Sequence, residues 1–135
     1  MYKVLLVDDE YMITEGLKKL NPRLTTGIWK WSQTAEDADQ ALDYVREHPV
    51  DVVITDVNMP GKTGLQMIAE MKDLIPDAAF IIMSGYQDFE YVKTALNLRV
   101  VDYLLKPVNK VEMGNILEKI SAPNPATKAK SWPTA

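Results

Sequence analysis

Five polar residues that can do phosphoryl chemistry follow apolar segments that lie far apart in the chain. Asp8 and Asp9 follow the run VLLV, and Asp56 follows the β-branched run VVIT. Ser84 comes after FIIM, and Lys106 comes after YLL. If each run is a strand of a parallel sheet, the carboxyl ends of the strands meet at one edge. We therefore expect all five side chains to gather at that edge.

The three aspartates of this set favour a divalent cation. Two carboxylates about 4 Å apart repel by roughly 4 kcal/mol at an effective dielectric near 20, so their clustering needs a cation or a proton. Mg²⁺ takes oxygen ligands, keeps several waters and often shares a phosphate. The chain has no cysteine and a single histidine, His48, which disfavours soft-metal sites. Mg²⁺ is therefore the expected cofactor.

The other two residues suit an anion. Lys106 supplies a point positive charge, and Ser84 supplies a hydroxyl donor. Asp56 can attack phosphorus directly and hold the group as an acyl phosphate. Catalysis would then consist of positioning and charge neutralisation around an in-line transfer.

Each motif also has a plain structural interpretation when it stands alone. The acids at 8–10 are typical of a helix start, and a single Asp56 after a strand is usually a loop residue. The pair SG at 84–85 is typical of a turn, and KP at 106–107 of a solvated strand exit. All four motifs at successive strand ends, in this order, are much harder to reach by chance.

Alternating short apolar runs and amphipathic segments predict the elements that position these residues. The expected strands cover 4–7, 28–34, 50–54, 80–83 and 100–105, and the expected helices lie around 13–20, 37–45, 65–75, 89–96 and 109–120. Strict alternation implies a parallel sheet with helices on both faces. We predict an α/β fold: a flavodoxin-like (βα)5, doubly wound parallel five-stranded sheet in the order 2-1-3-4-5.

Length and composition fit one ordinary globular domain. The 135 residues are 47% hydrophobic and 25% charged, with a net charge of −4. We place the domain at 1–121 and interpret 122–135 as a flexible tail or the start of a linker, native or engineered. The N-terminal apolar run is too short for a signal peptide or membrane span. We expect a cytoplasmic protein that itself binds neither membrane nor nucleic acid.

Four segments carry a family resemblance over about residues 3–120. VLLVDDE, VVITDVNMPGKTGL, FIIMSGY and VDYLLKPV resemble the signature blocks of CheY-like receiver domains of bacterial two-component response regulators. The resemblance implies a phosphorelay protein that takes a phosphoryl group from a sensor histidine kinase. It implies a phosphoacceptor that catalyses its own phosphorylation and slow dephosphorylation, and not a turnover enzyme.

The resemblance also implies roles for the site residues. Asp56 would be the phosphoacceptor. Asp9 and Asp56 would bind Mg²⁺ through their carboxylates, Asp8 would do so directly or through water, and Asn58 would add its backbone carbonyl. Lys106 would pair with a phosphoryl oxygen.

A second group of residues would carry the signal onward. Ser84 would bind the phosphoryl group, and the rotamer of Tyr103 would follow phosphorylation. The peptide before Pro107 is expected to be cis and to help aim Lys106. The surface that changes, which could also form a homodimer, would consist of the helix around 89–96, the strand at 100–105 and the helix around 109–120.

A finer resemblance concerns the output. EYMITEGLKKL, SGYQDFEYVKTAL and VVDYLLKPV are similar to receivers that precede AraC-type helix-turn-helix domains. That similarity implies transcription regulation in a longer parent, with DNA bound by a domain beyond Ala135.

Two other functions remain open on sequence grounds. One is a phosphatase or hydrolase that works through an aspartyl phosphate, which usually needs an added cap domain. The other is a pseudo-receiver that binds a partner without phosphorylation, against which the intact set of Asp8, Asp9, Asp56, Ser84 and Lys106 argues. His48 lies in a turn before Pro49, so a Ser/His/Asp triad has no credible base.

Overall fold

The computed structural model describes most of the chain. The described residues are 2–18, 29–57, 59, 61–85, 100, 102–106, 108 and 110–121. Four sequence predictions lie outside them: the helix around 89–96, the carbonyl of Asn58, the cis peptide before Pro107, and the tail at 122–135.

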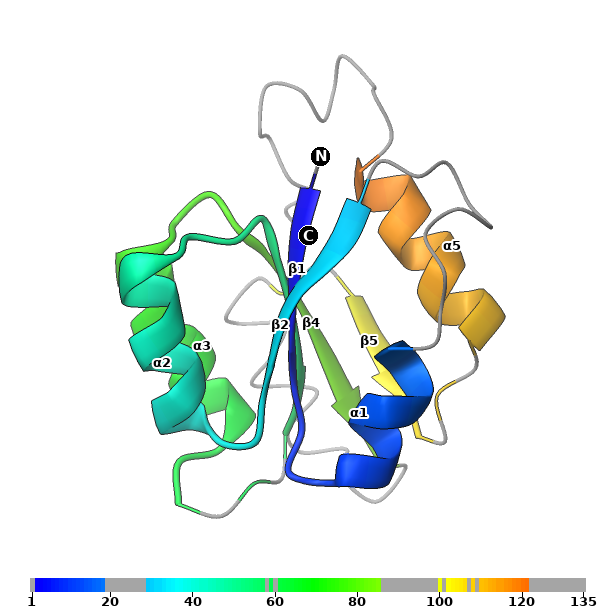
Figure 1. Cartoon of the computed structure of the whole chain (residues 1–135), viewed down its shortest axis with the longest axis horizontal. Helices are drawn as coiled ribbons and strands as arrows, with labels where there is room; N and C mark the ends of the chain where they lie inside the picture. The colour runs from blue at the N-terminus through cyan, green and yellow to red at the C-terminus, as the bar shows by residue number, and fades with distance from the viewer. Residues whose placement is uncertain are drawn as a thin grey trace.

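A five-stranded parallel sheet forms the centre of the molecule (Figure 1). Its strands are β1 (Tyr2–Val7), β2 (Trp29–Ala35), β3 (Val52–Asp56), β4 (Ala79–Ser84) and β5 (Asp102–Leu105). Their order across the sheet is β2-β1-β3-β4-β5, and every neighbouring pair is parallel. The predicted flavodoxin-like topology is therefore confirmed. β1 begins earlier than its apolar run, and β5 begins two residues later than predicted.

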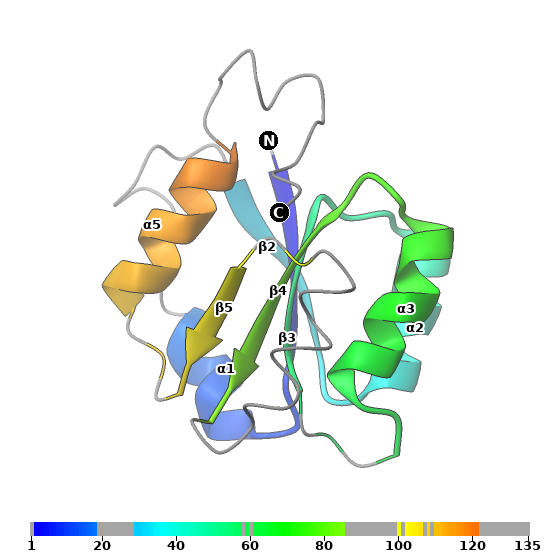
Figure 2. The ribbon, with the colours of Figure 1, turned by 180° about the vertical axis from the view of Figure 1, so that it is seen from behind.

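The described helices cover both faces of the sheet. They are α1 (Tyr11–Lys18), α2 (Ala38–Glu47), α3 (Gly64–Leu74) and α5 (Lys110–Ser121). α2 and α3 lie on one side, and α1 and α5 lie on the other, as the two opposite views show (Figures 1 and 2). Among the described residues, no helix has the length and apolar character that crossing a bilayer requires.

Strict alternation along the strands divides the core into two layers. In β1, Leu5 and Val7 belong to the layer that includes the buried residues of α2 and α3, whereas Val4 and Leu6 belong to the layer that includes α5. All four are fully buried. Because both faces of the central strands need apolar side chains, the sequences of these strands are continuous apolar runs.

Side-chain caps fix where two helices begin. Asp37 caps α2 by accepting a hydrogen bond from the backbone N–H of Gln40, as their spacing predicts. Thr63 and Gln66 form a capping box at the start of α3. Gly64 is the first residue of α3. The loop before it turns at Gly61, whose φ of 78° favours glycine.

Candidate functional site

The four strand-end residues are held by backbone hydrogen bonds that continue the sheet. Asp56 is the last residue of β3 and Ser84 the last of β4. The N–H of Asp8 donates to Ala35 O at 3.0 Å, and the N–H of Lys106 donates to Ser84 O at 2.8 Å. The sheet therefore positions the backbones of these residues at one edge, as the sequence predicts.

Strand parity aims three of these side chains at the same side of the sheet. Asp8 lies two residues after Leu6, Asp56 two after Ile54, and Lys106 two after Leu104. Those three apolar residues share one core layer. Because side chains two apart on a strand share a face, the two acids and the lysine point to that same face.

The ammonium group of Lys106 joins acids from separate parts of the chain. Its Nζ lies 3.0 Å from Asp56 Oδ2, 3.2 Å from Asp8 Oδ2 and 3.6 Å from Glu10 Oε1. The expected convergence of Asp8, Asp56 and Lys106 is thus present. Their chemical roles stay predictions.

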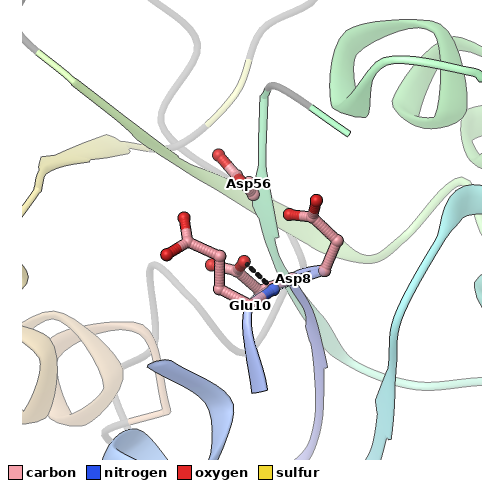
Figure 3. Close-up of side chains that lie close together, drawn as sticks. Asp8, Glu10 and Asp56 are labelled. Carbon is pink, nitrogen blue, oxygen red and sulfur yellow. Dashed lines mark hydrogen bonds between the residues drawn. The ribbon is translucent and has the colours of Figure 1, made fainter. Parts of the chain in front are cut away.

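Four carboxylates gather around this lysine. One oxygen from each of Asp8, Asp9, Glu10 and Asp56 lies within 4.8 Å of the others. Figure 3 shows the side chains of Asp8, Glu10 and Asp56 close together, at the ends of β1 and β3. Asp8 and Asp56 are only 1% and 4% exposed, whereas Asp9 and Glu10 are exposed. The cluster therefore has a buried floor and an exposed rim.

Asp8 is held in one orientation at a cost in electrostatic energy. Its Oδ1 accepts a hydrogen bond from the N–H of Glu10 at 2.9 Å (Figure 3). Its Oδ2 contacts Lys106 but has no hydrogen bond of good geometry among the described residues. Burial raises the pKa of Asp8 above its ordinary value, although the Glu10 N–H and the Lys106 charge partly oppose that rise. An added cation would relieve this cost.

Lys106 stays charged despite its burial. Burial lowers the pKa of Lys106, but the hydrogen bond and charge of Asp56, together with the charge of Asp8, outweigh it. The net result is a pKa above the ordinary value for lysine. A permanent positive charge therefore lies beside Asp56.

Ser84 and Tyr103 occupy related positions on neighbouring strands. The Oγ of Ser84 is buried and has no hydrogen-bond partner among the described residues. Tyr103 is the register partner of Ile82 on β4 and is 47% exposed. Ile82 and Ser84 are two residues apart, so Ser84 and Tyr103 face the same side of the sheet.

The donor set suits a hard divalent cation. All the candidate ligand atoms are carboxylate oxygens, which Mg²⁺ prefers. The buried Asp8 Oδ2, which has no well-formed hydrogen bond, is an atom that a cation or a water in its shell could satisfy. Asp8, Asp9 and Asp56 therefore fit the predicted Mg²⁺ site.

The sequence did not single out two residues that the structure places at the site. Glu10, predicted only as part of a helix start, contributes the fourth carboxylate. Gly64 packs against the phosphoacceptor candidate, since a Cβ at Gly64 would lie 2.2 Å from the backbone oxygen of Asp56. Its N–H also donates to Val57 O at 2.9 Å. A glycine that follows a loop is the only sequence signal for this contact.

The chain matches a family model and several curated proteins. A model described as response regulator receiver domain matches residues 4–118. An uncharacterized response regulatory protein of Staphylococcus epidermidis is 43% identical over 122 residues, which cover 87% of this chain and 46% of that protein. Transcriptional regulatory protein HptR of Staphylococcus aureus is 39% identical over 122 residues, with coverages of 89% and 46%. The chain spans about half the length of these relatives.

Solved structures show the same architecture. The REC domain of AraT, a response regulator from Geobacillus stearothermophilus, superposes with a TM-score of 0.80 at 33% identity, covering 87% of this chain and 91% of that one. A two component transcriptional regulator AraC from Clostridium phytofermentans gives a TM-score of 0.78 at 32% identity, with coverages of 88% and 92%.

The sheet order, the acids at its carboxyl edge and these matches agree with one another. Receiver domains of this kind generally bind Mg²⁺ at an acidic pocket, and the cluster around Lys106 has that composition. The chain belongs to the response regulator receiver domain family.

Proposed function

We propose that this domain accepts a phosphoryl group on Asp56 from a histidine kinase, with Mg²⁺ bound by the adjacent acids. The observation that carries the proposal is the ammonium group of Lys106, which lies within 3.2 Å of both the Asp8 and the Asp56 carboxylates. A buried acid with a permanent cation at its side is suited to hold a group that brings more negative charge.

The transfer itself needs few protein groups. An Asp56 oxygen attacks the phosphorus in line with the bond to the donor nitrogen. That bond breaks, and its electron pair returns to the imidazole of the kinase. Lys106 pairs with a phosphoryl oxygen in place of the Asp56 oxygen it now contacts. Asp8, Asp9 and Asp56 would hold Mg²⁺, whose charge would further neutralise the phosphoryl oxygens.

Phosphorylation would be read out through Ser84 and Tyr103. The buried Ser84 Oγ, which has no partner among the described residues, is a donor for a phosphoryl oxygen. A shift of Ser84 toward the phosphoryl group would open space on the sheet face that Ser84 shares with Tyr103. The surface of β5, α5 and the predicted helix around 89–96 would then change its affinity for a partner, including a second copy of the chain.

The output would be transcription regulation in a longer protein. The curated relatives include proteins named transcriptional regulators, and the chain covers about half of their length. The domain would itself turn over no external substrate, and it would act in the cytoplasm. DNA contact would belong to a segment beyond Ala135.

Labelling by a small phosphodonor tests the assignment. Acetyl phosphate with Mg²⁺ should add one phosphoryl group to the wild-type chain, as measured by intact mass, and none to Asp56→Asn. Asp73→Asn makes the same chemical change on an exposed residue of α3 and should label like the wild type. Labelling that survives Asp56→Asn would overturn the assignment.

Two further outcomes would favour other functions. Continuous turnover of a small phosphate ester would favour a phosphatase that works through an aspartyl phosphate. Failure to label, with partner binding that ignores Mg²⁺ and phosphodonor, would favour a pseudo-receiver.

A further inference from the structure

Glu10 is the acid of the cluster that the proposed chemistry does not use. Its backbone N–H orients Asp8, but its side chain is 61% exposed and lies at the rim (Figure 3). Its Oε1 is 3.6 Å from Lys106 Nζ, farther than the carboxylates of Asp8 and Asp56. Lys106 therefore neutralises Glu10 less than it neutralises the two buried acids.

The charges of the site do not balance when Glu10 is included. The four clustered carboxylates carry four negative charges, and the Lys106 ammonium group among them carries one positive charge. A bound divalent cation would leave one net negative charge, whereas the same site without the Glu10 carboxylate would be neutral. A small phosphodonor carries negative charge itself, so it would meet repulsion at the mouth of the pocket.

We propose that Glu10 is a specificity-determining residue, which slows phosphorylation by small dianionic donors free in solution. A charge at the rim of the pocket changes the rate at which a charged donor reaches the site, and it changes how that rate depends on salt. A kinase docks through a much larger surface, so one rim charge affects its encounter less. The inference rests on the proposed phosphoacceptor function.

Donors of different charge provide the test. Acetyl phosphate is a dianion at neutral pH, and phosphoramidate carries a single net negative charge. At saturating Mg²⁺ and low salt, Glu10→Gln should raise the second-order rate constant for acetyl phosphate by about three- to tenfold. The gain for phosphoramidate should be smaller, and both gains should shrink as ionic strength rises.

Glu47→Gln is the matched control. Glu47 is exposed at the end of α2, in a cavity that Lys3 and Pro49 also line, at the sheet edge opposite the acids. The same loss of charge there should leave both rate constants unchanged. Exposed Glu36 and Asp39 line a cavity of about 290 Å³ beside Asp9. Lys62 lines the same cavity, and because the charges of these three residues are the same in every variant, they do not alter the comparison.

A second measurement needs no phosphodonor. Because Glu10→Gln removes one negative charge near the cation, it should weaken Mg²⁺ binding by about two- to fivefold in a calorimetric titration. Two results would overturn the proposal for Glu10. One is an unchanged Mg²⁺ affinity in Glu10→Gln. The other is a ratio of the acetyl phosphate to the phosphoramidate rate constant that is the same in Glu10→Gln and in the wild type. Failure of every variant to label would instead overturn the phosphoacceptor function.

Discussion

A buried acid that is costly when ionised is the residue-scale feature of this site. Asp8 is 1% exposed, and burial raises its pKa above 3.8. A group whose folded pKa is raised contributes stability that is present below the unfolded pKa. That stability is lost as pH rises through the folded pKa. At neutral pH without metal, the ionised Asp8 therefore lowers the free energy of unfolding.

Replacing this acid by its amide should stabilise the metal-free domain. In Asp8→Asn the side-chain oxygen still accepts from the Glu10 N–H, and Lys106 keeps Asp56 as its partner. We expect the free energy of unfolding at neutral pH, from urea titration in EDTA, to rise by about 1 kcal/mol. The gain should disappear as pH falls toward the unfolded pKa. A variant less stable than the wild type at neutral pH would refute this account of Asp8.

The same substitution should weaken Mg²⁺ binding, since it removes a negative charge from the proposed cation site. If both results hold, the pocket gives up stability for cation binding, as the proposed phosphoryl transfer requires. Asp73→Asn, on the exposed face of α3, should change neither quantity.

At the scale of elements, the start of α3 packs closely against the end of β3. The backbone oxygen of Asp56 accepts from Thr55 Oγ1 at 2.9 Å. Gly64 approaches that same oxygen so closely that a Cβ would overlap it. The neighbouring Val57 donates its N–H to Met83 O and accepts from the N–H of Gly64. The position of the phosphoacceptor candidate therefore depends on where α3 begins.

Gly64→Ala tests this dependence. The added Cβ would lie 2.2 Å from a backbone atom that no side-chain rotation can move. We expect a loss of about 1–3 kcal/mol in the free energy of unfolding, as for other overpacked sites. We also expect slower labelling of the folded protein, measured well below its melting temperature. Labelling at the wild-type rate would mean that Gly64 matters for stability alone.

Gly16→Ala provides the control within the same fold. Gly16 lies inside α1, and an added Cβ there would meet nothing within 4 Å. Because alanine has the higher helix propensity, this variant should be as stable as the wild type or more stable by about 1 kcal/mol. Its labelling rate should not change.

Much of the element structure is predictable from local signals. The apolar run after Lys3 predicts a strand buried on both faces, and this part of β1 is buried in the structure. The spacing of Asp37 and Gln40 predicts the helix cap that is present. The role of Gly64 could not be predicted, because its contact with Asp56 depends on how α3 packs against β3. The sequence alone cannot distinguish such a glycine from an ordinary loop residue.

For the whole molecule, topology brings together residues that the sequence keeps far apart. Parallel strands in the order 2-1-3-4-5 place the ends of β1, β3, β4 and β5 at one edge, so the convergence of Asp8, Asp56 and Lys106 followed from the strand predictions. The position of Glu10 did not follow from the strand predictions. It depends on the turn after β1, which places the exposed Glu10 carboxylate 3.6 Å from the Lys106 ammonium group.

Chemical location of the phosphorylated residue tests directly whether Asp56 is the phosphoacceptor. The domain is incubated with acetyl phosphate in Mg²⁺ or in EDTA. Borohydride then reduces any acyl phosphate to an alcohol, which turns aspartate into homoserine, and peptide mass mapping finds the position. We expect homoserine at position 56 alone, and only with Mg²⁺. Homoserine at another acid, or equal conversion of Asp56 in EDTA, would show that Asp56 is not the Mg²⁺-dependent phosphoacceptor.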